Sequence, residues 1–232
     1  MRAPLSIIIP TLNAADDLPA TLGSLVEGLE AAILREVIVS DGGSADETRA
    51  LAEAAGCVWA SGPAGRGGQL ARGAVVAGGE WLLFLHADSC PQPGWTVAVA
   101  EHMRNHPARA GWFRLRFDTG GCAPRLVAGW ANFRARALGL PYGDQGLLIP
   151  RALYRQAGGF RDIPLMEDMA MARALRGRLA GLDASVRTSA RRYRQEGWLR
   201  RGASNLALQI RFLCGADPAV LAQAYRPRGP RF

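Results

Sequence analysis

The sequence predicts an α/β fold in which helices cover both faces of a mostly parallel sheet. Three observations support this prediction. Short apolar runs, typical of buried strands, alternate with segments of helical periodicity through residues 5–88. Several runs end at a proline, a glycine pair or an acid. The chain has 232 residues, of which 49% are hydrophobic, and this suits one continuous domain with a sizeable core.

Four buried strands are expected in the first part of the chain, at residues 5–10, 36–44, 57–61 and 80–88. The helices between them are expected at residues 14–29, 44–56 and 65–79. Ser44 is the expected N-cap of the second helix, and Glu47 three residues later completes a capping box. Because such sheets bind ligands at the carboxyl ends of their strands, we expect Asp41 and Asp88 to point into one crevice.

The second half of the chain is less regular. Residues 110–118 alternate as a strand does, and a turn and a short strand precede Arg151. Helices are expected at residues 125–139, from about 151, at 166–181 and at about 198–213, with a shorter one before a frayed tail at 226–232. We found no internal repeat and no low-complexity linker.

The amino-acid composition indicates which classes of ligand or partner the protein could bind. The net charge is +8, and all 28 basic residues are arginines, whose planar fork of donors can hold a phosphate in two places. A nucleotide, an anionic lipid and nucleic acid all fit this charge. The four cysteines fit neither a zinc site nor a disulfide framework, and no signal peptide or membrane span is evident, so a cytoplasmic protein with reduced cysteines is expected.

Two stretches indicate a nucleotide site. Asp41 stands before two glycines, where it either turns the chain or offers a carboxylate to a ligand. The glycine-rich residues 65–73 precede a helix and could accept a phosphate, with Arg66 and Gln69 as candidate contacts. They are not a P-loop, because no Gly-Lys-Ser/Thr closes them.

Two pairs of residues carry the candidate chemistry, one of a histidine with an acid and one of two acids. His86 and Asp88 are two residues apart in extended chain and face the same side, so both could approach one divalent ion. Asp88 could instead cap the next helix. Glu167 and Asp168 lie in the first turn of an expected helix, where they either answer the helix dipole or supply a general base.

Four stretches occur in the order and spacing of a family 2 glycosyltransferase of the GT-A fold: SIIIPTLNAADDLPATLGSL, EVIVSDGGSADET, GRGGQLARGAVVAGGEWLLFLHADS and MEDMAMARAL. The resemblance covers about residues 5–178. The chain is similar in particular to the short bacterial group called radical-SAM/selenodomain-associated transferase 2, which has His-Ala-Asp in place of Asp-x-Asp. The resemblance implies a Rossmann-like GT-A domain at residues 1–190 and a helical extension at residues 191–232 packed on the same domain.

The resemblance also implies roles for individual residues. Asp168 would be the catalytic base with Glu167 beside it, and Asp88, with His86 in the place of the first acid, would hold Mg²⁺ or Mn²⁺. The donor, a nucleoside-diphosphate sugar, would contact Pro10, Thr11, Asn13, Asp17, Asp41, Arg66, Gln69, His86, Ala87, Asp88, Gly143, Asp144, Gln145, Arg191 and Arg192. Transfer to an acceptor hydroxyl would proceed with inversion. The histidine leaves the identity of the metal, and the need for one, open.

Several alternatives remain. A sugar-phosphate nucleotidyltransferase would release pyrophosphate, and a non-catalytic nucleotide-binding module would do no chemistry. A nucleic-acid module would interleave aromatic and basic residues on one surface, whereas the arginines here spread through the helices, so no nucleic-acid partner is expected. Residues 203–215 either pack on the sheet or lie on a membrane surface at its inner face, which would favour a lipid-linked acceptor. A homo-oligomer also remains open.

Overall fold

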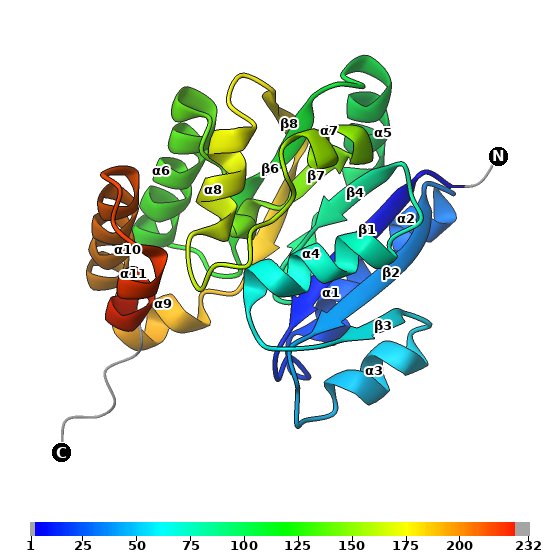
Figure 1. The fold of residues 1–232 in the computed structure, drawn as a ribbon, viewed down its shortest axis with the longest axis horizontal. Coiled ribbons are helices and arrows are strands. Elements are labelled where there is room, and N and C mark those ends of the chain that lie inside the picture. Colours follow the sequence, from blue (N-terminus) through cyan, green and yellow to red (C-terminus); the bar gives the residue numbers. More distant parts are fainter. Residues whose placement is uncertain (1–2, 226–232) are drawn as a thin grey trace.

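The computed structural model describes residues 3–225, which form one sheet with helices on both faces (Figure 1). The strand order is β3-β2-β1-β4-β7-β6-β8-β5. The strands are β1 (Leu5–Thr11), β2 (Leu34–Asp41), β3 (Val58–Ser61), β4 (Trp81–Phe84), β5 (Ser89–Pro91), β6 (Ala110–Phe117), β7 (Leu147–Pro150) and β8 (Leu179–Thr188). The predicted α/β class is therefore confirmed.

The four strands predicted in the first part of the chain pair in parallel, β2 with β3 and β1 with both β2 and β4. In β1, Ile7 and Ile9 belong to the apolar cluster on one face of the sheet, and Ile8 belongs to the cluster on the other. This alternation explains the continuous apolar run, since a strand covered on both faces needs no polar side. The last pair in the β1–β2 register is Thr11 with Asp41.

The remaining strands make the sheet mixed. Strand β7 runs antiparallel to β4 and β6, β6 runs parallel to β8, and the short β5 runs antiparallel to β8. Strands β5 and β8 had not been predicted, and the helix predicted at residues 166–181 extends over the start of β8. The helix ends earlier because Gly177 takes a left-handed φ of 79°, and the alternating Leu182, Ala184 and Val186 then enter the core as a strand.

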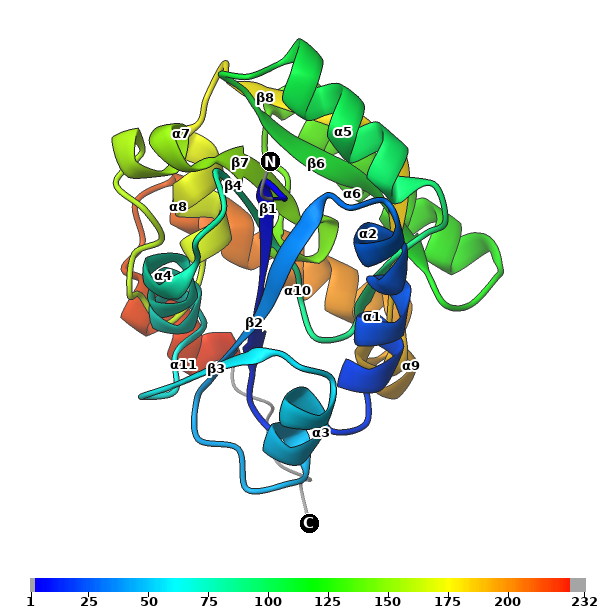
Figure 2. The ribbon, with the colours of Figure 1, turned by 90° about the vertical axis from the view of Figure 1, so that its right-hand side faces the viewer.

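The helices are α1 (Leu18–Ser24), α2 (Val26–Glu30), α3 (Thr48–Ala54), α4 (Arg66–Val76), α5 (Trp95–Asn105), α6 (Cys122–Leu138), α7 (Arg151–Gln156), α8 (Glu167–Ala174), α9 (Arg191–Glu196), α10 (Trp198–Leu213) and α11 (Pro218–Tyr225), with a 3₁₀ turn η1 (Gly143–Gln145). Figure 2 shows α4, α7 and α8 on one side of the sheet and α1, α2 and α5 on the other. Helix α5 had not been predicted.

Two local predictions were wrong. Helix α3 begins at Thr48, and Ser44 is not its N-cap; the side chain of Ser44 instead donates to Asp41, and Oδ1 of Asp46 accepts the Thr48 amide at 3.1 Å. Helix α10 has the predicted bounds but packs on α6, α9 and α11 rather than on the sheet. Helices α9 to α11 are the described part of the predicted extension, and residues 226–232 lie outside the described residues.

None of the helices in residues 3–225 is both long enough and apolar enough to cross a membrane.

Candidate functional site

A cavity of about 770 Å³ opens beyond the carboxyl ends of β1 and β4. Its walls come from the loops after these strands, from the first turns of α4 and α8, and from α9, α10 and α11. Most of the predicted site residues line it: Pro10, Thr11, Asn13, Asp17, Arg66, Gln69, His86, Ala87, Asp88, Asp144, Glu167, Asp168, Arg191 and Arg192. Tertiary structure thus brings together residues that lie far apart in the sequence.

Asp41, Gly143 and Gln145 are not among the lining residues of this cavity. Asp41 is 2% exposed, and its carboxylate accepts hydrogen bonds from the amides of Gly43 and Ser44 and from the hydroxyls of Thr11 and Ser44. Although burial opposes ionisation, these hydrogen bonds lower the pKa of Asp41. Its carboxylate therefore shapes the loop after β2, and the predicted contact with the base or ribose stays a prediction.

Gln69 fixes the start of α4 against the sheet. Its Nε2 donates to the carbonyls of Thr11 (2.6 Å) and Ser40 (2.9 Å), and its Oε1 accepts the Gly65 amide at 3.3 Å. The glycines of this stretch allow a close approach, since a Cβ on Gly67 would lie 2.0 Å from the Arg161 carbonyl oxygen. The glycine-rich sequence is thus explained by packing as well as by the cavity that it borders.

Asp88 follows β4 and lines the cavity together with Asp17. Burial, reinforced by the carboxylate of Asp17, raises the pKa of Asp88, while Arg192 and Arg66 oppose this rise. Burial and the Asp17 carboxylate thus make the ionised form of Asp88 unfavourable in spite of the two arginines. The site therefore favours an incoming cation, or a ligand that brings one.

His86, in the loop after β4 that also carries Asp88, packs tightly against Gly143. Its Nε2 is buried without a hydrogen-bond partner, and a Cβ on Gly143 would lie only 2.4 Å from it. Burial, followed by the positive charges of Arg66 and Arg192, lowers the pKa of His86 well below its usual value. The ring is therefore neutral at neutral pH. Position 143 requires glycine, because the His86 ring lies too close to leave room for a side chain there.

Asp168 is held by two backbone amides. Oδ2 accepts the Gly143 amide at 2.9 Å, and Oδ1 accepts the Met169 amide at 2.7 Å. The residue before this pair of acids, Met166, has a left-handed φ of 68°, a conformation that is uncommon outside glycine and that often marks functional sites. This kink begins α8 and directs Asp168 to the cavity wall.

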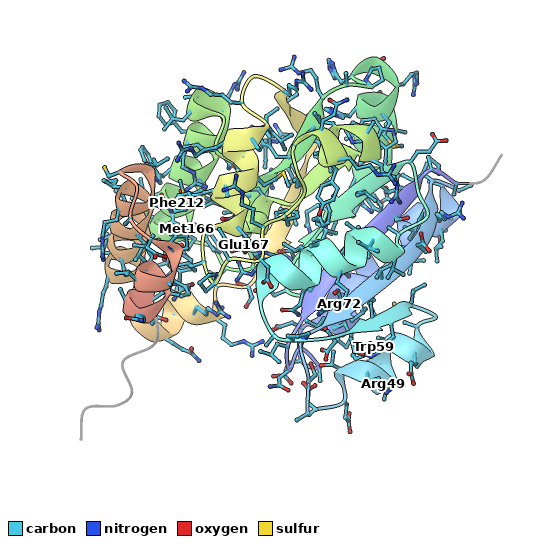
Figure 3. All side chains as sticks on the ribbon, viewed as in Figure 1. Arg49, Trp59, Arg72, Met166, Glu167 and Phe212 are labelled. Carbon is cyan, nitrogen blue, oxygen red and sulfur yellow. The ribbon has the colours of Figure 1, made fainter. Side chains whose placement is uncertain are left out.

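Glu167 differs from Asp168 in its surroundings. It is 3% exposed, and its Oε1 lies 3.3 Å from Nη1 of Arg66. Burial, together with the neighbouring Asp168 carboxylate, raises the pKa of Glu167 despite Arg66. Figure 3 shows Met166 and Glu167 at the start of α8, close to the start of α4. Glu167 therefore joins α8 to the arginine of α4, and Asp168 is the better placed of the two to meet a ligand.

A buried arginine that had not been predicted as a site residue lies beside the 3₁₀ turn. Arg134 of α6 is 5% exposed, its guanidinium carbon lies 3.2 Å from the centroid of the Tyr142 ring, and its Nε donates to the Leu140 carbonyl at 2.9 Å. Burial raises the pKa of Asp144 to about 6, and Arg134 only partly offsets this. Gln145 is fully buried and donates to Asn132 and to the Phe113 carbonyl, so it supports this turn.

The C-terminal helices close one wall of the cavity. Arg191 forms ion pairs with Asp16 at 3.5 Å and Asp17 at 2.5 Å, and thereby joins α9 to the loop after β1. Tyr193 stacks on Trp198 with ring centroids 4.7 Å apart. Further lining residues that had not been predicted are Arg201, Asn205, Leu208, Gln209 and Tyr225. The amphipathic pattern of α10 was the one feature of the sequence that could have indicated these residues, but such a pattern does not show which side of a helix faces a ligand.

The residues present fit a divalent cation only in part. No group of three or more histidines, cysteines or acids within residues 3–225 is arranged to bind a metal by itself. Asp88 is a suitable oxygen ligand, and magnesium and manganese sites often use one or two carboxylates with the remaining ligands from phosphate and water. The donor set therefore fits a cation that arrives with a diphosphate, held by Asp88.

Comparisons with solved structures agree with this fold. The 1–349 fragment of S. aureus TarS superposes with a TM-score of 0.65 and 16% identity, covering 94% of this chain and 68% of that one. The same fragment in complex with UDP-GlcNAc gives 0.64 at 18% identity, covering 80% and 58%. Glucosyl-3-phosphoglycerate synthase of Mycobacterium tuberculosis, in complex with Mn²⁺, UDP and glucosyl-3-phosphoglycerate, gives 0.52 at 19% identity, covering 80% and 70%.

Sequence comparisons place the chain in a family. PGL/p-HBAD biosynthesis glycosyltransferases of Mycobacterium tuberculosis and Mycobacterium bovis are 37% identical over 115 residues, which cover 46% of this chain and 44% of each relative. The match thus spans less than half of the length of these relatives. The family model described as Glycosyl transferase family 2 matches residues 6–140, which is more than half of the chain. This chain therefore belongs to glycosyl transferase family 2 and has the GT-A fold.

Proposed function

We propose that this chain transfers a sugar from a nucleoside-diphosphate sugar to an acceptor hydroxyl, with inversion at the anomeric carbon. The observation that carries the proposal is the position of Asp88 and Asp168 on one cavity, with Arg66, Arg191 and Arg192 around them. Two carboxylates and three arginines suit a reaction that releases a nucleoside diphosphate and removes a proton from the acceptor hydroxyl. The solved relatives were crystallised in complex with UDP-GlcNAc and with UDP and Mn²⁺, which favours a uridine diphosphate sugar as the first donor to test.

Asp168 is the proposed general base. Its carboxylate is held by the amides of Gly143 and Met169 and retains lone pairs that can accept the acceptor's hydroxyl proton. As the proton moves to Asp168, the acceptor oxygen bonds to the anomeric carbon and the bond from that carbon to the diphosphate oxygen breaks. Attack from the face opposite the leaving group inverts the configuration.

The arginines and Asp88 act on the leaving group. Arg66 and Arg192 can donate to the diphosphate oxygens, where negative charge increases as the bond breaks. A magnesium or manganese ion held by Asp88 would neutralise part of the same charge when bound. Glu167, buried against Arg66, holds that arginine in place. The predicted place of the chain in the radical-SAM/selenodomain-associated group and a boundary near residue 190 remain part of this proposal.

A product assay tests the function. The chain would be incubated with a panel of nucleoside-diphosphate sugars and candidate acceptors, with and without Mn²⁺, and the released nucleotide identified. Release of nucleoside diphosphate together with a glycosylated acceptor is the expected result. Release of pyrophosphate from a nucleoside triphosphate and a sugar phosphate would instead identify a nucleotidyltransferase. Binding of a nucleotide sugar without turnover across the acceptors would favour a non-catalytic module.

A further inference from the structure

The outward side of α6 is apolar along its length. Leu126, Trp130 and Phe133 follow one another at spacings of four and three residues, so they share one side of the helix, and they are 72%, 46% and 58% exposed. The rings of Trp130 and Phe133 lie 5.9 Å apart. The opposite side, which contains Ala128 and Ala131, is buried. An apolar stripe on the solvent side of a surface helix reverses the usual amphipathic arrangement.

Helix α10 shows the same feature. Leu206, Ile210 and Leu213 are spaced by four and three residues and are exposed. On its other side, Leu208 and Gln209 are buried and line the cavity. The apolar residues that α10 exposes are therefore not needed to hold it in place.

These two neighbouring helices carry half of the exposed large apolar side chains. Eight of the sixteen large hydrophobic side chains exposed within the described residues lie on these two helices: Leu126, Trp130, Phe133, Leu138, Leu199, Leu206, Ile210 and Leu213. Helices α6 and α10 pack on each other, and Figure 1 shows them at the end of the molecule opposite α3. We call these eight residues the α6–α10 surface. Gathered apolar side chains of this kind mark interaction sites.

The charges on the two helices identify the partner. Arg125 and Arg136 of α6 and Arg200 and Arg211 of α10 are exposed, and neither helix contains an aspartate or glutamate. A second copy of this chain would bring a matching set of arginines to the same contact, with no acid on these helices to oppose them. A bilayer with anionic headgroups supplies both an apolar interior and negative charge.

We propose that the α6–α10 surface docks on an anionic lipid bilayer. Trp130, Phe133 and the leucines would enter the boundary between headgroups and acyl chains, and the flanking arginines would contact the lipid phosphates. Because the inner side of α10 lines the cavity, docking would bring the cavity close to the membrane. In combination with the proposed sugar transfer, on which this last step rests, the acceptor class is a hydroxyl carried by a membrane lipid.

Vesicle flotation with the full chain tests the docking. Vesicles of phosphatidylcholine alone are compared with vesicles of phosphatidylcholine mixed with phosphatidylglycerol. The variants are Trp130→Ser/Phe133→Ser on α6 and Leu206→Ser/Ile210→Ser on α10. The control is Val75→Ser/Val97→Ser, which removes two apolar side chains from α4 and α5 that are more exposed than those of the test variants. All exchanged side chains are exposed, so the variants are expected to fold, as circular dichroism would verify.

The unmodified chain is expected to float with the anionic vesicles only, and less so at high salt. Each test variant should lower the bound fraction at least about tenfold, since two apolar anchors are lost, while the control floats normally. Absence of the unmodified chain from the anionic vesicles, or equal flotation of the test variants, would overturn the proposal. So would a dimer in size-exclusion chromatography that only the test variants dissociate.

Calorimetry with UDP separates this result from the proposed function. The test variants leave the cavity intact and should bind UDP as the unmodified chain does. If no form of the chain binds any nucleotide sugar while flotation behaves as expected, the transfer proposal fails and the docking surface stands.

Discussion

The backbone amide of Gly143 donates a 2.9 Å hydrogen bond to Oδ2 of Asp168 and thereby joins the turn before β7 to the first turn of α8. The same glycine packs against the ring of His86, where a Cβ would lie 2.4 Å from Nε2. One residue without a side chain thus links the proposed base to the strand end that carries Asp88. The geometry of the site depends on this three-way contact, and the first two predictions examine it.

Replacing Gly143 with alanine should disturb the site. The new methyl group would force His86 or the turn to move, at a cost of about 1–3 kcal/mol in the free energy of unfolding, and would displace the amide that holds Asp168. Urea denaturation and a turnover assay would both report a loss. Gly23→Ala on α1, where a Cβ meets nothing within 4 Å, is the matched control and should leave both unchanged or slightly raise stability. Full turnover in Gly143→Ala would show that this hydrogen bond is dispensable.

Asp168→Asn should lower turnover by about 10²–10⁴ while affinity for the donor is largely kept. The amide side chain keeps the size of the carboxylate but cannot take the acceptor's proton. Steady-state kinetics and donor titration measure the two effects separately. Asp183→Asn, at a solvent-exposed aspartate paired with Arg114 on the surface, serves as the control. An Asp168→Asn enzyme that works at the normal rate would transfer the role of base to another group, with Glu167 the next to test.

Asp88→Ala should weaken donor binding in the presence of Mn²⁺ more than in its absence. In the native chain burial and the Asp17 carboxylate raise the pKa of Asp88. A bound cation would offset both effects, because it stabilises the ionised carboxylate. Calorimetry of a nucleoside-diphosphate sugar, with and without the metal, measures the difference. Equal affinities for the variant and the native chain under both conditions would remove Asp88 from this role.

Asp144→Asn should change the pH dependence of stability. Burial raises the pKa of Asp144 to about 6 from 3.8, so the folded state holds a proton that the unfolded state has released between these values. Stability therefore falls as pH rises through that interval, and the penalty is fully present above pH 6, at an upper bound of about 3 kcal/mol. The asparagine variant lacks this penalty and should gain stability relative to the native chain from about pH 4 to about pH 7. Urea denaturation across this range checks the slope, and parallel curves for both proteins would show that Asp144 does not carry it.

Local sequence pattern was sufficient for the strands that carry the nucleotide half of the site. The runs that became β1, β2 and β4 are apolar on both faces, and the acids that follow them can only be tolerated where a strand reaches an edge. This is why Asp88 could be assigned to the cavity before the fold was known. Asp41 lies at the end of β2 as predicted, but its carboxylate accepts hydrogen bonds from its own loop and from Thr11, so its predicted contact with a ligand stays a prediction.

By itself, then, the sequence determined the α/β class, the parallel first half, the bounds of α10 and the family, because these follow from periodicity and from motifs with fixed spacing. Only the tertiary structure decided that β8 joins the sheet between β6 and β5, that Arg134 lies buried beside Tyr142, and that Gly143 supports Asp168. It also decided that α10 turns one side to the cavity and leaves the other exposed. Those relationships join residues far apart in the chain. Their energies come from burial and from hydrogen bonds that no local window of sequence contains.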